Sequence, residues 1–361
     1  MSDKGDPDLR LETIEALSAA HDVPVLDLLM IAANMHGVDA DVDIPRARIR
    51  LSPETSSEVW QIILPLENPD SPFRLAGGQL RLDGQKVARI EALENDDVVL
   101  TYLRAGGRSV TLNTNSRSNC IGCIFCPNII EDAADATVSG VDGLESVLTW
   151  LCADLDWPGL AQVEVITVCS GCFHTPAAAI RHMAELRKAA GRLGFTGRLH
   201  LLSSVVRDRD DIKRLAELAG PFHLTFTLEC FERRDVLLKS TKASLTVEET
   251  CRALDDCADL GVLGDFTYVA GLDSLAAAAD GLERLSGCVT AFPRIQVYQA
   301  HNDLMRRYRS ADAADLRYYI DLRRRVEPAL AARGLAPKSW ENYRPLWYER
   351  FAGEAVAGPR I

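Results

Sequence analysis

The chain has 361 residues, which is long enough for one large and one small domain. Of these residues, 47% are hydrophobic and 25% charged, as in an ordinary globular protein. Its formal net charge of −12 argues against broad binding to nucleic acid, and no apolar run approaches the roughly 20 residues of a membrane helix. The polar, acidic first residues are unlike a signal peptide. We therefore expect a cytoplasmic protein whose ten cysteines stay reduced, with no nucleic-acid or membrane partner.

Residues 1–107 are expected to form a small N-terminal α+β accessory domain. Two helical patterns begin it, at 9–20 and 25–36, and Pro24 suits the start of the second helix. A helix-turn-helix is one interpretation of this pair. The acidic balance of the chain favours the other, a small helical lid packed on its neighbour.

The pattern changes at residue 49 to short β runs. Asp83 and Gly84 form a turn signal between two of these runs, and the last run spans 98–103. No residue pattern in this region indicates chemistry.

The segment 108–305 alternates strand and helix patterns, which is typical of a parallel sheet covered by helices. Six βα units make three-quarters of a TIM-like barrel, so we expect a partial (β/α)6 barrel with its chemistry at the carboxyl ends of the strands. The expected strands are 110–114, 163–168, 199–203, 223–228, 266–270 and 294–298.

Three cysteines follow the first of these strands at Cys-x2-Cys-x2-Cys spacing: Cys120, Cys123 and Cys126. Three thiols this close cannot all pair as disulfides, but soft thiolates can converge on one iron–sulfur cluster. Three ligands on a four-iron cluster leave one iron open for a substrate or cosubstrate. The alternative is a structural zinc site, which needs four ligands, and no obvious fourth lies beside the triplet.

This loop, with Phe125 just before its last cysteine, resembles the radical S-adenosylmethionine superfamily, although the usual spacing there is Cys-x3-Cys-x2-Cys. The resemblance covers Val110 to about His301. It implies an open (β/α)6 barrel and a 4Fe-4S cluster whose open iron binds S-adenosylmethionine. Reductive cleavage of the sulfonium would give a 5′-deoxyadenosyl radical, with electrons from a partner such as flavodoxin or ferredoxin.

The segment after the second expected strand carries Cys169, Ser170, Gly171 and Cys172. Ser170 and Gly171 match the glycine-rich segment that receives the amino group of S-adenosylmethionine in the family; a plain tight turn is the alternative. Cys169 and Cys172 form a second Cys-x2-Cys pair that could hold an auxiliary cluster, but two packed thiols are the simpler interpretation.

Glu229 ends the fourth expected strand, where related enzymes hold the ribose hydroxyls or the methionyl end of the cofactor. A carboxylate suits either task. The following loop, with Lys239, Ser240 and Lys242, resembles the biotin synthase and thiamine-tyrosine lyase branch and could contact an anionic group. Solvated lysines are the alternative.

Gly271, after the fifth strand, and Val297, in the sixth, match positions that flank the adenine in the family. Tyr298 and His301 lie near the expected mouth of the barrel as possible substrate contacts. His301 could serve as an acid or base, although a lone loop histidine is more often a capping or surface residue.

The segment 306–361 is expected to close the barrel. A long charged helix, 311–333, precedes a tail in which aromatic residues recur at helical spacing beyond Pro337. Packing across the open side of the barrel explains this tail, which could also place Arg344 against a substrate carboxylate. The aromatic residues are Trp340, Tyr343, Trp347, Tyr348 and Phe351.

These patterns together predict a radical S-adenosylmethionine enzyme, a lyase or mutase, acting on a small amino-acid-like or other carboxylate-bearing substrate. Hydrogen abstraction would lead to cleavage or rearrangement of a carbon skeleton, with Arg344, Tyr298, His301 and Lys239 as candidate catalytic residues. One alternative is a methyl- or sulfur-transferase with a second cofactor, such as another cluster or cobalamin. The other is a zinc-stabilised binding module without catalysis.

Overall fold

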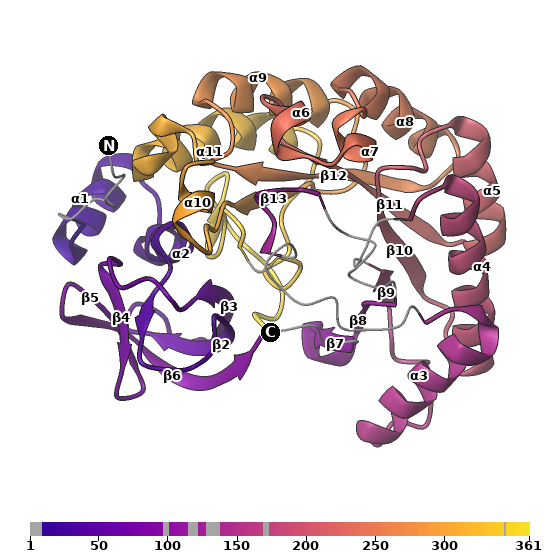
Figure 1. Cartoon of the computed structure of the whole chain (residues 1–361), viewed down its shortest axis with the longest axis horizontal. Coiled ribbons are helices and arrows are strands. Elements are labelled where there is room, and N and C mark those ends of the chain that lie inside the picture. Colours follow the sequence, from indigo (N-terminus) through magenta and orange to yellow (C-terminus); the bar gives the residue numbers. More distant parts are fainter. Residues whose placement is uncertain (1–8, 97–100, 115–121, 128–137, 169–172, 343) are drawn as a thin grey trace.

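The computed structural model describes residues 9–96, 101–114, 122–127, 138–168, 173–342 and 344–361. Its described part contains an N-terminal sheet and a larger curved sheet whose outer face is covered by helices (Figure 1). The predicted α/β class is therefore confirmed. No helix within these residues combines the length and apolar character needed to cross a bilayer.

The N-terminal sheet has six strands in the order β1-β4-β5-β6-β2-β3. The turn predicted at Asp83 and Gly84 joins β5 to β6, and its two residues have φ values of 46° and 79°. Positive φ at both central residues is the geometry of a type I′ hairpin, which explains the Asp-Gly pair. The strands are β1 Asp39–Ala40, β2 Arg46–Pro53, β3 Trp60–Pro65, β4 Phe73–Ala76, β5 Gln79–Leu82 and β6 Gln85–Asn95.

The two predicted N-terminal helices are present as α1 (Leu11–His21) and α2 (Val25–His36). Every residue of α2 from Leu26 to His36 is buried, because the helix lies against β3, β13 and α11. A helix buried on all sides is part of a core. This burial supports packing on a neighbour over a helix-turn-helix that presents a face to DNA.

The larger sheet runs in the order β13-β12-β11-β10-β9-β8-β7, and the six strands from β8 to β13 are parallel. The last β run of the N-terminal region, predicted at 98–103, belongs to this sheet as β7, antiparallel to β8. The domain boundary at residue 107 stays a prediction. The strands are β7 Thr101–Arg104, β8 Ser109–Leu112, β9 Val165–Val168, β10 Arg198–Ser203, β11 Phe222–Glu229, β12 Leu263–Ala270 and β13 Arg294–Val297.

Helices connect the parallel strands and lie outside the sheet (Figure 1). Local capping fixes where several begin. Thr246 and Glu249 form the reciprocal side-chain and backbone hydrogen bonds of a capping box at the start of α8. The helices are η1 Ala105–Gly107, α3 Gly140–Asp154, α4 Pro176–Arg192, α5 Arg209–Ala219, α6 Arg234–Leu237, α7 Ser240–Ala243, α8 Val247–Asp259, α9 Leu275–Ser286 and α10 Asp303–Arg306.

The C-terminal region differs from its prediction. The helix expected over 311–333 is divided into η4 (Ala311–Ala314) and α11 (Leu316–Ala331), because Asp315 caps a new helix start. The tail is not helical in its described residues and ends in the short strands β14 (Arg350–Phe351) and β15 (Glu354–Ala355). Arg344 precedes Pro345, and a residue before proline disfavours the helical conformation.

The tail instead extends the edge of the large sheet. The Val297 amide donates to the Arg344 carbonyl at 2.7 Å, and Gln296 forms an antiparallel bridge with Pro345. An uncovered edge strand exposes unpaired backbone groups, so this pairing protects β13. The expectation that the tail packs across the end of the sheet is thus supported at β13.

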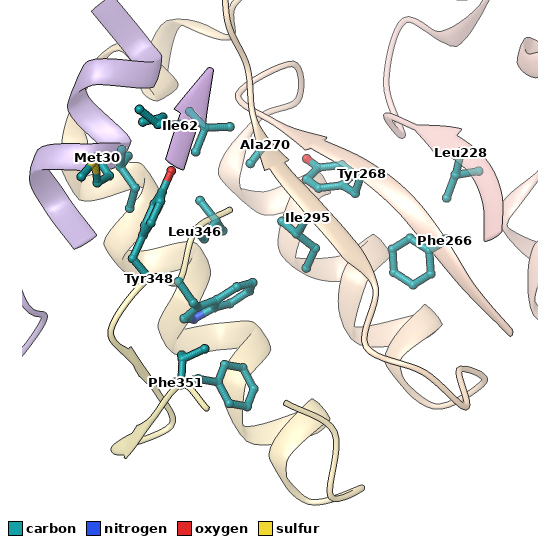
Figure 2. Close-up of a cluster of buried hydrophobic side chains, with 14 of the residues drawn as sticks. Met30, Ile62, Leu228, Phe266, Tyr268, Ala270, Ile295, Leu346, Tyr348 and Phe351 are labelled. Atoms are coloured by element: carbon teal, nitrogen blue, oxygen red, sulfur yellow. The ribbon is translucent and has the colours of Figure 1, made fainter. Parts of the chain in front are cut away.

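The tail is anchored by a buried ion pair between helices far apart in the sequence. Arg323 of α11 donates to Asp27 of α2 at 2.6 Å, and the backbone amides of Tyr348 and Glu349 donate to the same carboxylate. Figure 2 shows Leu346, Tyr348 and Phe351 packed in one apolar cluster with α2 and β13. Trp347, Tyr348 and Phe351 are therefore core residues, whereas Trp340 is only half-buried. Tyr343 lies outside the described residues.

Candidate functional site at the carboxyl ends of the strands

The described part of the cysteine loop, residues 122–127, lies at the carboxyl ends of the parallel strands. Cys123 and Phe125 are buried there, in an apolar cluster with Val269 at the end of β12 and Tyr298 just after β13. The first cysteine of the motif, Cys120, lies outside the described residues. The loop is thus at the end of the sheet where sequence reasoning expected chemistry.

The loop contacts the segment after α6 through backbone groups. The Ile124 amide donates to the Leu237 carbonyl at 3.0 Å, and the Lys239 amide donates to the Cys123 sulfur at 3.5 Å. Gly122 has φ +106°, and a Cβ there would lie 3.0 Å from that of Lys239. Only glycine suits this close approach with that backbone conformation.

Glu229 and Lys242 form an ion pair beside the loop. The Lys242 ammonium lies 2.6 Å from a Glu229 carboxylate oxygen, and the lysine and glutamate side chains are 10% and 13% exposed, respectively. Glu229 follows a bulge between β11 and β12 and has φ +74°, an uncommon value for a residue other than glycine. Unusual backbone and a desolvated charge pair are concentrated at functional sites, so the pair marks this end of the sheet.

Arg234 holds the lysine loop in place. Its guanidinium donates to the carbonyls of Lys242 at 2.6 Å and Leu245 at 2.8 Å, and to the carbonyl of Leu228 in β11 at 2.6 Å. Because one rigid side chain links the strand end to the loop, the position of Lys242 relative to Glu229 is fixed by the fold.

The chemistry of the described donors fits an iron–sulfur cluster. Cys123 carries a free thiol. Burial raises its pKa, and the Lys242 charge and the Lys239 amide oppose that rise by favouring the thiolate. Hydrogen bonds from amide N–H groups to the ligand sulfurs are among the features that set the reduction potential of an iron–sulfur cluster. No group of three or more metal-binding side chains occurs among the described residues, which do not include Cys120.

Arg344 is brought to this end of the sheet by the tail. Its guanidinium donates to the Gln296 side chain at 2.6 Å. Burial and the nearby Arg46 lower the pKa of Arg344, whereas Cys126 and Glu229 oppose this, so both groups lie within its electrostatic reach. Cys126 and Glu229, far from Arg344 in the sequence, therefore act on its charge.

The charges of the same two arginines act on His301. Burial, Arg46 and Arg344 lower its pKa to about 3, so the imidazole is neutral at physiological pH. Its Nε2 atom is buried and has no hydrogen-bond partner among the described residues. A neutral imidazole can accept or donate one hydrogen bond to a ligand, but at this pKa it is a poor general acid near neutral pH.

Arg46 is a site residue that sequence reasoning missed. It lies on β2 of the N-terminal sheet, where no chemistry was expected, and is held by Asp96 at 2.9 Å. The alternation Arg46, Arg48, Arg50 along one strand was the available signal, because alternate residues share a face.

Tyr298 has a structural partner. Its hydroxyl donates to the Met305 carbonyl at 2.9 Å, and its ring meets Phe125 edge-on with 6.3 Å between centroids. Lys239 is half-buried, and its backbone amide rather than its ammonium contacts Cys123. The suggested catalytic roles of Tyr298 and Lys239 stay predictions.

Gly271 and Val297, expected to flank the adenine, have backbone groups engaged by the C-terminal region. The Gly271 amide donates to the Tyr318 hydroxyl at 3.3 Å, and the Val297 amide bonds to Arg344. Their roles toward a cofactor stay predictions. Ser170 and Gly171, with the flanking Cys169 and Cys172, lie outside the described residues.

Comparisons with known proteins give little beyond these observations. No protein-family model matches the sequence, and no curated protein matches it. One similar solved structure is described as a radical SAM methyltransferase from Sphaerobacter thermophilus. The match has 15% sequence identity and a TM-score of 0.43, and covers 98% of each chain. A likeness at this level does not establish a shared fold or activity.

Proposed function

We propose that this protein is a radical S-adenosylmethionine enzyme. The observation that carries the proposal is the position of the Cys-x2-Cys-x2-Cys loop. Its described cysteines, Cys123 and Cys126, lie at the carboxyl ends of six consecutive parallel strands, beside the buried Glu229–Lys242 pair. Soft thiols at this end of such a sheet support a catalytic cluster more than a structural zinc site, which needs a fourth ligand.

The finer architecture follows from the same proposal. The strands β8 to β13 with their outer helices correspond to an open (β/α)6 barrel spanning 108–305. Residues 1–107 would then be an accessory domain, and 306–361 a segment that closes the barrel. The pairing of the tail with β13 supports this division.

Cys120, Cys123 and Cys126 would hold a 4Fe-4S cluster, and Glu229 would accept hydrogen bonds from the ribose hydroxyls or the ammonium of S-adenosylmethionine. When bound, such a cluster would supply the electron for reductive cleavage of S-adenosylmethionine. The surrounding apolar residues, including Phe125, exclude water from this region. A reducing partner such as flavodoxin or ferredoxin and a cytoplasmic location belong to the same proposal.

The substrate is proposed to be small and to carry a carboxylate, which Arg344 would bind. Burial of this guanidinium favours a bidentate anion, and the neutral His301 beside it offers one further hydrogen bond. The expected reaction is hydrogen abstraction followed by cleavage or rearrangement of the carbon skeleton.

Anaerobic reconstitution with iron and sulfide tests the proposal. We expect about four irons per chain and, after reduction with S-adenosylmethionine present, formation of 5′-deoxyadenosine; about eight irons would indicate a second cluster. Colourless protein that holds stoichiometric zinc and forms no 5′-deoxyadenosine would overturn the proposal in favour of a zinc-stabilised module.

The carboxylate-bearing substrate is tested separately by Arg344→Lys in a screen of candidate metabolites. We expect this variant to fold and to form uncoupled 5′-deoxyadenosine like the parent, but to yield much less substrate-derived product, because lysine cannot form the bidentate contact. Equal product yield would remove the support for a carboxylate at Arg344 while leaving the cluster assignment intact.

A further inference from the structure

A second polar region lies at the opposite, amino-terminal end of the same sheet. His200 of β10 and His223 of β11 stack with 4.2 Å between ring centroids. The His200 ring nitrogens lie 3.1 Å and 2.8 Å from the hydroxyls of Thr167 and Thr225. These groups lie on neighbouring strands, so the parallel register fixes them without any loop.

A buried carboxylate extends this network. Asp265 of β12 accepts from Arg294 of β13 at 2.7 Å and lies 3.1 Å from His223 through the same oxygen. Burial alone would raise the pKa of Asp265, but Arg294 and His223 together lower it, so the carboxylate stays charged. Arg294 also reaches Glu341 of the tail at 3.2 Å. The network therefore joins five strands, β9 to β13, to the C-terminal segment.

A cavity of about 460 Å³ opens beside this network, and we call it the amino-terminal cavity. Residues of β9 to β13 line it, together with the tail residues Lys338, Trp340, Glu341 and Asn342. Its volume is that of a small-ligand site. Its lining includes no residue of the cysteine loop and neither Glu229 nor Lys242, although it reaches Gln296, which accepts from Arg344.

The lining of this cavity is cationic, although the chain as a whole has a net charge of −12. Four basic side chains line it, Arg104, Arg198, Arg294 and Lys338, against one carboxylate, Glu341. Burial lowers the pKa of His200 well below its usual value, and Arg294, His223, Arg104 and Lys338 lower it further. The titration of this histidine thus reflects a positive potential in the cavity.

Two of these cations are available to a ligand. The Arg198 guanidinium is half-buried and makes no hydrogen bond or ion pair with the described residues. Lys338 is exposed, lies 3.9 Å from Glu341, and has its ammonium 5.4 Å from the centre of the Trp340 ring. Arg294 is already committed to Asp265. An arginine without a partner in a cationic cavity is suited to a planar, multiply charged anion.

We propose that the amino-terminal cavity binds a small organic anion, bearing carboxylate or phosphate groups, through Arg198 and Lys338. The site does not depend on the proposed cluster chemistry, since none of its residues belongs to the cysteine loop. Trp340 provides an apolar surface for the carbon part of the ligand.

Calorimetric titration of the full-length protein at low salt tests this site. The two probes are tricarballylate, for carboxylates, and 2-phosphoglycolate, for phosphate esters. We expect saturable binding of at least one probe with about one site per chain, weakened by added salt. Arg198→Gln should weaken it about 10- to 100-fold, the range for loss of a charge-assisted contact. Lys338→Gln should weaken it less, because that side chain is exposed.

Three controls distinguish binding in this cavity from nonspecific attraction of anions and from binding at the cysteine loop. Arg252→Gln, an exposed arginine on α8, should bind the probes like the parent. Cys123→Ala should also bind them like the parent, and saturating S-adenosylmethionine should not compete. The proposal is overturned if the parent binds neither probe at millimolar concentrations, if Arg198→Gln and Lys338→Gln both bind like the parent, or if S-adenosylmethionine displaces the probe.

Discussion

The two ends of the large sheet carry polar groups in different ways. At the carboxyl end, the thiols and Lys242 come from the segments that follow strands, and only Glu229 belongs to a strand. At the amino end, His200, Asp265 and Arg294 all lie within strands. Side chains outside the strands are held by a few contacts, such as those of Arg234. The positions of side chains within the strands are set by the backbone hydrogen bonds between the strands.

This difference indicates different tasks. Loop-borne groups can adjust to a cofactor, and the elements that move in binding are drawn from the less stable parts of a fold. The polar side chains of the network at the amino end hydrogen-bond mainly to one another. Because they join neighbouring strands, they stabilise the sheet. We therefore expect substitutions at the carboxyl end to affect cofactor chemistry and those in the amino-end network to affect stability.

The largest expected effect is that of Cys123→Ala on the proposed cluster. Loss of one of three thiolate ligands should abolish iron and sulfide retention and 5′-deoxyadenosine formation, with little change in thermal stability. Iron quantitation and visible absorption measure this. Cys257→Ala, which removes a buried thiol from α8, should keep full iron content. A Cys123→Ala protein with parental iron and turnover would show that this thiol is not a ligand.

The next largest effect is expected for Asp265→Ala, at the amino end of the large sheet. It leaves Arg294 buried without its carboxylate, which should cost about 3–5 kcal/mol of unfolding free energy. Chemical denaturation measures the loss. Asp259→Ala, at a surface pair with Arg209, should cost at most about 1 kcal/mol. Equal stabilities for the two variants would contradict a structural role for the amino-end network.

Glu229→Gln is expected to have an intermediate effect, on cofactor binding. Loss of a charge-assisted hydrogen bond should weaken S-adenosylmethionine binding by about 1.5–3 kcal/mol, roughly 10- to 100-fold, with the cluster retained. Titration of reconstituted protein measures the affinity, and Glu283→Gln on the exposed face of α9 is the matched control. Unchanged affinity would leave the Glu229–Lys242 pair a structural feature.

Acidification should destabilise the protein through its buried histidines. Burial lowers the pKa of His182 on α4 to about 4, so between this value and about 6.5 the unfolded chain binds a proton that the folded chain does not. The stabilisation is present above pH 6.5 and is lost as the pH falls, by about 2 kcal/mol at pH 5. His200 contributes in the same direction at the amino end.

Thermal unfolding of His182→Gln and His200→Gln between pH 7.5 and 5 measures these contributions. Each variant should lose part of the pH dependence, since glutamine does not titrate in this range. If both variants keep the pH dependence of the parent's thermal stability, other groups are responsible for the acid sensitivity.

Local sequence patterns determined much of the fold. The six parallel strands were found within a few residues because each is a short apolar run between turn or helix signals. The Asp83-Gly84 turn and the Thr246–Glu249 capping box are predictable from sequence, because the interactions that determine each of them fall within four consecutive residues. The cysteine triplet was visible for the same reason, since ligand spacing in a loop is a local property.

Other features were decided by tertiary structure. Aromatic spacing suggested a helical tail, but Pro345 and the open edge of β13 favoured an extended segment. Residues from separate elements meet in the Lys242–Glu229 pair and in the His200–Asp265–Arg294 network, and the charge of Arg46 acts on His301. Periodicity reports which face of an element is buried, whereas strand order and register decide which buried polar groups meet. The sequence therefore determined the elements and the cysteine motif, and the packing of the sheet determined what surrounds them.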